Sequence, residues 1–151
     1  MSRAGIQCVG GGVTVADAML HAPKVCGSAT TVAQAREIFE DDHVHAVLVV
    51  DGGRLLAVVE RPDISSMSPQ VPAWLSGRLQ GRVVRPDADL DAAWSVMTAD
   101  QRRRLAVIDD QGMLRGLLCL KRTGLGFCSD ADVEARASER RANATALRAD
   151  R

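Results

Sequence analysis

The sequence predicts a mixed α/β (α+β) protein built from two β-α-β-β-α copies that pack on each other. The first observation is that the order of apolar and turn residues recurs 58 positions later, and 59 positions later beyond the second turn. The second is that both copies contain an aliphatic run, a glycine-containing turn and a further apolar run. The third is that a helix with an N-terminal capping signal precedes this hairpin in both copies. Two copies are too few for an open solenoid, because each would leave one face uncovered.

The internal repeat rests on matched residue classes more than on strict identity. The matched pairs include Val25 with Val83, Ala35 with Ala93, Asp51 with Asp109 and Leu55 with Leu114. Self-similarity at one spacing indicates two equivalent structural units.

The first copy predicts one helix between short strands. Thr31 and Gln34 form a capping-box pattern, and Val32, Ala35 and Phe39 share one helical face. The valine-rich run at 46–50 predicts a strand buried on both faces. The turn at 51–53 leads into a return strand at 54–59, and residues 24–26 predict a short leading strand.

The second copy repeats this plan. Asp89 is placed to cap a helix, residues 105–108 predict the inner strand and residues 113–120 the return strand. Residues 82–84 predict its leading strand. A further helix is expected to begin at Thr14, with Asp17 at its third position, and to end before Pro23.

These elements give five segments along the chain. Residues 1–12 are expected to be a flexible leader, 13–64 the first repeat, 65–80 a linker, 81–136 the second repeat and 137–151 a charged helical tail that frays. The linker assignment rests on its serines and prolines, which cannot sustain a long helix.

Composition argues against several classes of protein. The 19 basic and 19 acidic residues balance, which argues against nucleic-acid binding by bulk charge attraction. The apolar runs are too short to cross a bilayer, and the N-terminal residues lack an apolar segment of signal-peptide length. We therefore expect a cytoplasmic protein that binds neither nucleic acid nor membranes.

Cysteine and histidine give weaker signals. Cys8, Cys26, Cys119 and Cys128 form no C-x-x-C pair, which favours buried thiols over a disulfide scaffold or a metal site. Cys128 has polar neighbours and is the thiol to test for reactivity. Zinc binding through His43 and His45 is a distant alternative to a polar loop, because further ligands would have to converge there. We expect no metal site.

The stretches "VLVVDGGRLLAVVERPDI" and "LAVIDDQGMLRGLLCLKR" carry a resemblance to a known family. Together with the repeat order, they resemble a tandem pair of CBS domains, also called a Bateman module, over about residues 13–136. The resemblance implies two copies related by a pseudo-twofold axis, with two clefts that bind adenine nucleotides in many members. It also implies a regulatory module that is not an enzyme, requires no cofactor and forms a homodimer.

The family's nucleotide signature has a glycine first, a hydroxyl residue fourth and an aspartate seventh. In the first copy these positions are Ala57, Glu60 and Asp63; in the second copy they are Gly116, Cys119 and Arg122. The resemblance implies a ribose acceptor at the aspartate and a phosphate near the hydroxyl. The two clefts are therefore expected to differ, and only the first keeps the ribose acceptor. In the second cleft, Lys121 and Arg122 could attract an anion.

The predicted ligand site lies in the first cleft, with one ligand such as AMP, ADP, ATP or another adenosine compound. Asp63 is expected to hold the ribose and Arg61 the phosphate, which Glu60 would otherwise repel. The backbone around Val25, Cys26, His45 and Ala46 is expected to contact the base.

Two alternatives stay open. Asp63 could cap the short segment that follows it, and the chain could be a ligand-free dimerisation or partner-binding module whose clefts have decayed. The stretch "QRRR" at 101–104 is expected to be a solvated face balanced by nearby acids rather than a phosphate site.

Overall fold

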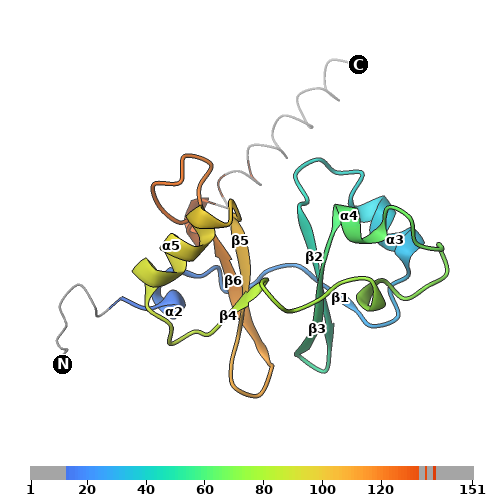
Figure 1. Cartoon of the computed structure of the whole chain (residues 1–151), viewed down its shortest axis with the longest axis horizontal. Coiled ribbons are helices and arrows are strands. Elements are labelled where there is room, and N and C mark those ends of the chain that lie inside the picture. The colour runs from blue at the N-terminus through green and yellow to red at the C-terminus, as the bar shows by residue number, and fades with distance from the viewer. Residues whose placement is uncertain (1–12, 133–134, 136–137, 139–151) are drawn as a thin grey trace, which may run out of the picture.

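A computed structural model of the chain describes residues 13–132, 135 and 138, and shows two halves, each with its own three-stranded sheet (Figure 1). The first sheet contains β1 (Val25–Gly27), β2 (Ala46–Asp51) and β3 (Arg54–Glu60) in that order. Strand β1 runs parallel to β2, and β2 runs antiparallel to β3. The predicted fold class is confirmed.

The helices of the first half begin where their capping residues predict. Helix α3 (Val32–Ile38) starts after Thr31, whose hydroxyl accepts from the Gln34 amide while the Gln34 side chain accepts from the Thr31 amide. Its apolar face, including Val32 and Ala35, is buried against the sheet. A single turn, α4 (Arg61–Ile64), follows β3 directly.

The second half repeats the sheet with the same order and directions. It contains β4 (Val83–Val84), β5 (Arg104–Ile108) and β6 (Leu114–Cys119). Helix α5 (Leu90–Ala99) is capped by Asp89, as predicted, through the Ala92 amide. Each hairpin turn contains a glycine in the left-handed region, Gly53 in the first and Gly112 in the second.

The second half departs from the predicted plan after its last strand. In place of a helical turn such as α4, the chain reverses and residues 126–128 pair back onto residues 119–121. Gly124 and Gly126 lie in this reversal, and glycine disfavours helix. A helix begins after Ser129, which caps it through the Asp132 amide. The leader at 1–12 and nearly all of the tail at 137–151 lie outside the described residues.

The segment that leads into the sheet of each half packs on the other half. Helix α2 (Val15–Ala18), capped by Thr14 as predicted, packs Val15 into the core of the second half. The 3-10 helix η2 (Ala73–Leu75), within the segment 65–80, packs Ala73 into the core of the first half. The halves therefore exchange equivalent segments.

Backbone pairing follows the same exchange. Leu20, which precedes β1, forms a bridge with Leu117 of β6, with N–O distances of 2.8 and 3.0 Å. Arg78, which precedes the second repeat, forms the equivalent bridge with Val58 of β3. The third strand of each sheet, β3 or β6, therefore forms backbone hydrogen bonds with a segment that leads into the sheet of the other half.

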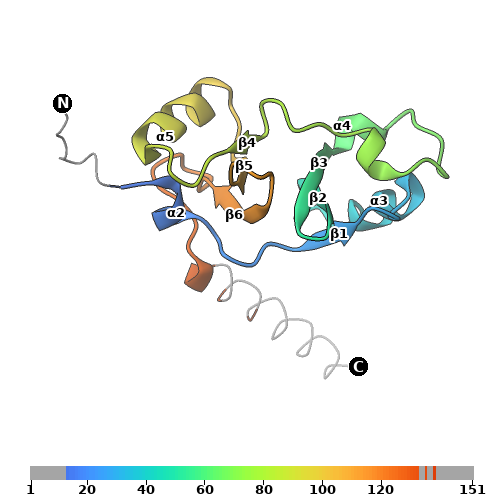
Figure 2. The same ribbon diagram turned by 90° about the horizontal axis from the view of Figure 1, so that it is seen from below.

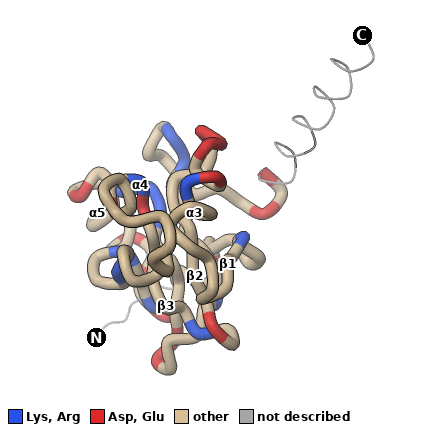
Figure 3. Tube along the Cα trace, turned by 90° about the vertical axis from the view of Figure 1, so that its right-hand side faces the viewer, with Lys and Arg blue, Asp and Glu red and all other residues tan. Residues whose placement is uncertain are grey.

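Three apolar clusters hold this arrangement. One fills each half between its sheet and its helices, and the third lies between the two sheets. The middle cluster contains Leu48, Leu55 and Val58 of the first sheet and Ala106 of the second. Figure 2 shows the two sheets in the middle of the molecule, with α3 and α5 on the outer sides. Basic and acidic segments are interspersed in the view of Figure 3.

Gly116 permits the closest of these chain crossings. A methyl group at this position would lie 2.4 Å from the Leu20 carbonyl oxygen and 2.8 Å from the Met19 sulfur. The backbone at Leu20 is fixed by its bridge to β6, so it cannot move away without losing those hydrogen bonds. The glycine that begins the family signature in this copy is therefore required by packing.

We predict that Gly116→Ala lowers the free energy of unfolding by about 1–3 kcal/mol, as overpacked sites do. Gly27→Ala is the control, because a methyl group there meets nothing within 4 Å. Its stability is expected to be unchanged or slightly raised. Urea denaturation of both variants measures the difference, and equal stabilities would contradict the assigned role of Gly116.

Candidate functional site

The end of β3 and the turn α4 present the acidic groups of the first cleft. Glu60 is the N-cap of α4, and the Asp63 carboxylate accepts the Glu60 amide hydrogen at 2.7 Å. Pro62 lies in the first turn, where its missing N–H costs nothing. This capping box fixes both carboxylates at the edge of the sheet that faces the second half.

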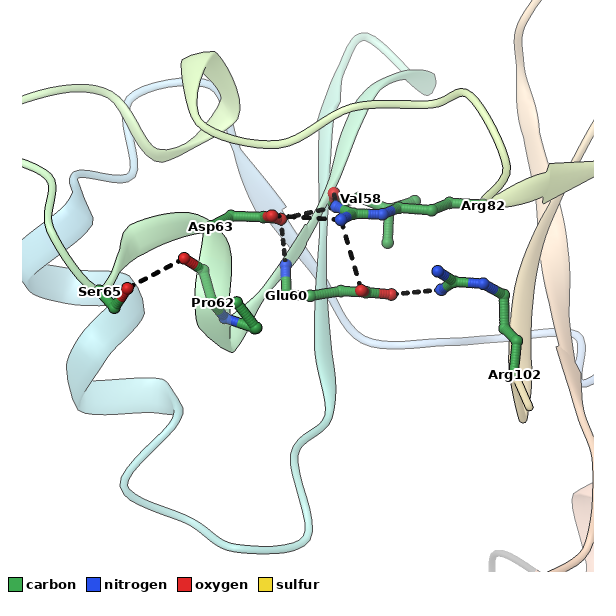
Figure 4. A network of polar contacts seen from close by, with 7 residues as sticks. All are labelled: Val58, Glu60, Pro62, Asp63, Ser65, Arg82 and Arg102. Atoms are coloured by element: carbon green, nitrogen blue, oxygen red, sulfur yellow. Dashed lines mark hydrogen bonds and ion pairs between the residues drawn. The ribbon is translucent and has the colours of Figure 1, made fainter. Parts of the chain in front are cut away.

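A buried arginine from the second repeat binds these carboxylates (Figure 4). Arg82 directly precedes β4, and its side chain is 3% exposed. Its guanidinium donates to Asp63 Oδ2 at 2.6 Å, to Asp63 Oδ1 at 3.1 Å and to the Val58 carbonyl at 2.7 Å, and it lies 3.4 Å from Glu60 Oε1. Among the described residues, Arg82 Nε has no hydrogen-bond partner.

This contact changes the ionisation of both partners. Burial of Asp63 opposes its ionisation, but the hydrogen bonds from Arg82 and the Glu60 amide, with the Arg82 charge, lower the pKa of Asp63 overall. The same hydrogen bond to Asp63 raises the pKa of Arg82 further. Asp63 is therefore an ionised carboxylate at neutral pH.

A second arginine joins the halves at Glu60. Arg102, in the loop between α5 and β5, forms a short ion pair with Glu60 Oε2 (Figure 4). Glu60 thus lies between Arg82 and Arg102, and replaces the hydroxyl of the family signature with a carboxylate that is already paired.

A pocket of about 290 Å³ opens beside this ion pair and is lined by both repeats. Its lining consists of His45, Ala46 and Glu60 from the first repeat and Asp100, Gln101, Arg102, Arg103 and Arg104 from the second. Burial, followed by the charges of Arg104, Arg103 and Arg61, lowers the pKa of His45. The pocket therefore combines a neutral imidazole with a cationic wall.

Three of the seven predicted ligand residues, His45, Ala46 and Glu60, line this pocket. The Asp63 side chain is 13% exposed and is not in the pocket lining. Val25 and Cys26 lie on β1, opposite Leu48 and Val49 of β2, and are not in the pocket lining.

The remaining predicted ligand residue, Arg61, binds the backbone of its own repeat. Its guanidinium donates to the carbonyls of Phe39, Asp41 and Val44 and lies 5.0 Å from the centre of the Phe39 ring. These contacts hold α4 against the end of α3. The predicted roles of all seven residues stay predictions.

A second pocket of about 400 Å³ lies at the end of β6. Its lining consists of Arg103, Lys121, Arg122, Cys128, Asp132 and Ala135. It has the cationic character expected from Lys121 and Arg122, and Arg103 lines both pockets.

The roles of Arg82 and Arg102 were not predicted from the sequence. The repeat aligns Arg82 with the ordinary exposed residue Lys24, so nothing local marks it. The loop at 101–104 was expected to be solvated, whereas all four of its residues line the pocket. In the described part of the chain, no three potential metal ligands come together. No helix among the described residues is long and apolar enough to span a membrane.

We predict that Arg82→Ala lowers the free energy of unfolding by about 3 kcal/mol, because it leaves two partly buried carboxylates without the guanidinium that pairs with them. Arg85→Ala is the control: Arg85 is 52% exposed and pairs with Asp87 at 3.8 Å, so its loss should cost about 0.5 kcal/mol or less. Denaturant unfolding measures both values, and equal costs would contradict the central role of Arg82.

The Arg82→Ala effect should also depend on pH. Since the folded-state pKa of Asp63 is depressed, its contribution is complete above the unfolded value near about 3.9 and is lost as the pH falls through the folded value. The difference between wild type and Arg82→Ala should therefore be constant at neutral pH and shrink below about pH 4.

Comparison with known proteins agrees with this architecture. The profile of the CBS domain matches twice, at residues 15–69 and 63–122. No curated protein sequence matches the chain.

Solved structures with the same fold include three that are informative. The cystathionine β-synthase pair domain of SO5017 from Shewanella oneidensis MR-1 is 26% identical, with 82% of this chain and 71% of that chain covered and a TM-score of 0.63. CBSX2 in complex with AMP is 25% identical, with 85% and 99% covered and a TM-score of 0.61. The cytosolic domain of the Mg²⁺ channel MgtE in complex with ATP is 22% identical, with 66% and 44% covered and a TM-score of 0.53.

The two profile matches span both sheets and the segments that the halves exchange. They show that the chain belongs to the CBS domain family and contains a tandem pair of these domains.

Proposed function

We propose that the chain is a regulatory module that senses an adenosine-type nucleotide in the pocket between its two CBS repeats. The observation that carries this proposal is the wall formed by Arg102, Arg103 and Arg104 opposite His45 and Glu60. Guanidinium groups are strong phosphate ligands, because they combine charge with paired donors. CBS domain pairs as a family are regulatory rather than catalytic modules, and the related CBSX2 structure contains AMP.

The pocket dimensions favour a small nucleotide. Its volume of about 290 Å³ is at the lower end of the ligand pockets of about 300–1,000 Å³ found in proteins. A mononucleotide suits this size better than a dinucleotide does.

The phosphate and ribose contacts follow from which groups are still available. Arg61 already donates to three carbonyls, so we assign the phosphate chiefly to Arg102–Arg104. Asp63 accepts two hydrogen bonds from Arg82 and one from the Glu60 amide. A carboxylate offers about four acceptor sites, so about one is left for a ribose hydroxyl, which would have to extend beyond the pocket lining because Asp63 is not part of it.

Glu60 lowers the affinity for a phosphate group, because it competes for Arg102. A phosphate that approaches Arg102 meets the Glu60 carboxylate, which is already paired with that guanidinium. The nucleotide must therefore displace an internal anion. In one state of the protein the Glu60–Arg102 pair is formed, and in the other it is broken. A ligand that binds the second state more tightly would favour that state, and with it a changed packing of the two repeats.

We predict that AMP, ADP or ATP binds with one ligand per chain, and that Glu60→Gln binds it about ten times more tightly because a competing charge is removed. Arg104→Gln should bind about ten times more weakly through the loss of a charged hydrogen bond. Arg122→Ala is the matched control, since Arg122 lines the other pocket, and its affinity should be unchanged. Isothermal titration calorimetry measures all four proteins.

Two equal binding sites per chain would contradict the assignment to the pocket beside Glu60. So would an Arg122→Ala protein whose nucleotide affinity falls as much as that of Arg104→Gln. If neither wild type nor Glu60→Gln binds any of the three nucleotides, the second candidate function is favoured. In that candidate the chain is a ligand-free dimerisation or partner-binding module. The occupied carboxylates favour it, because Arg82 and Arg102 fill positions that a ligand would need.

Both candidates include a homodimer, which stays a prediction, as does the cytoplasmic location.

A further inference from the structure

Two cysteines lie opposite each other at the end of β6. After Cys119 the chain reverses and pairs back, with a bridge between Leu120 and Phe127. The Lys121 amide donates to the Gly126 carbonyl at 2.8 Å, and the Cys128 amide donates to the Cys119 carbonyl at 2.7 Å. This antiparallel register makes Cys119 and Cys128 a directly opposed pair.

Opposed positions of this kind fall within reach of a disulfide. Side chains of directly opposite residues in an antiparallel pair lie on the same face. Their Cα atoms are about 5.5 Å apart at hydrogen-bonded positions, and disulfides span about 4.4–6.8 Å. Both thiols belong to one small buried cluster with Leu20, and both are free.

The second pocket borders this pair of buried thiols, of which Cys128 is 2% exposed and Cys119 is 7% exposed. Cys128 lines this pocket together with Arg103, Lys121, Arg122 and Asp132. Lys121 pairs with Asp132 at 3.9 Å, so the lining keeps an excess of positive charge, which favours an anionic reagent. Cys119, at the end of β6, packs in the same cluster with Leu20 and Leu117. Burial, and then the hydrogen bond with the Cys128 thiol, raises the pKa of Cys119 to about 11.

We propose that Cys119 and Cys128 form a reversible dithiol–disulfide site that is oxidised by an anionic low-molecular-weight disulfide such as glutathione disulfide. In the first step the Cys128 thiol loses its proton, its sulfur bonds to one sulfur of the reagent, and one thiol leaves. In the second step the Cys119 thiol loses its proton and attacks Cys128, which releases the second thiol. The reagent gains the two electrons that the protein thiols lose.

The bond would connect two segments at the second pocket. It would join the end of β6 to the strand that forms a wall of the second pocket. Asp130, two residues after Cys128, binds the His21 amide at 3.0 Å and His21 Nδ1 at 2.7 Å. A disulfide at Cys128 would therefore hold the start of the helix that follows Ser129 in place. Through Asp130, that helix start contacts His21 in the segment between α2 and β1.

The test is a tryptic map of the whole folded protein after incubation with glutathione disulfide, with remaining thiols blocked before digestion. Trypsin cleaves between the two cysteines at Lys121 and Arg122, so a bond between them yields residues 116–121 linked to residues 123–136. We expect this linked pair as the main oxidised product, and dithiothreitol should return both peptides to the free form.

Two variants separate the steps. Cys119→Ser should accumulate Cys128 bound to one glutathione, because no second thiol is present to release it. Cys26→Ser is the matched control and should yield the same linked pair as wild type. The wild-type map does not depend on either variant being stable. A glutathione adduct without the link in wild type, a link to Cys8 or Cys26, or no oxidised product would each overturn the proposal.

Discussion

The buried guanidinium of Arg82 is the interaction on which the rest of this structure depends. It belongs to the second repeat, yet its charge lies among the carboxylates of Asp63 and Glu60 in the first. A charge taken out of water is tolerated only when it is paired and hydrogen-bonded. Both conditions are met only while the repeats are docked. The same contact orders α4 and places Glu60 in reach of Arg102. The geometry of the candidate nucleotide pocket is therefore a consequence of how the two repeats are joined.

The exchange of α2 and η2 between the halves keeps the two repeats docked, and so holds Arg82 against its partners. Helix α2 completes the core of the second half, and η2 completes the core of the first. Neither half buries its own sheet without a segment from the chain that leads into the other. A ligand that opens the Glu60–Arg102 pair would act on a docked, jointly packed unit rather than on a flexible hinge. That is the physical basis on which a small molecule in this pocket can change a surface elsewhere.

Local features of this fold could be predicted from the sequence, and distant contacts could not. The caps at Thr31 and Asp89 and the hairpins were predictable, because each depends on residues a few positions apart. The exchange of α2 and η2 leaves no local pattern, since a buried helix face looks the same whichever core it enters. Arg82 was missed for a related reason: its partners lie 19 and 22 residues away. Of the candidate site, the residues next to the strand ends were predicted, and the arginine wall was not.

The central claim is that the two repeats form one cooperative unit. The chain has two tryptophans, Trp74 against the core of the first half and Trp94 on α5 of the second. Trp74→Phe and Trp94→Phe therefore give two proteins whose fluorescence reports on one half each. The most direct measurement is urea unfolding of both, followed by fluorescence and by far-ultraviolet circular dichroism. One cooperative unit predicts that the two signals share a midpoint within each protein. A fluorescence transition clearly separated from the circular dichroism transition, with one repeat still folded after the other has melted, would contradict it.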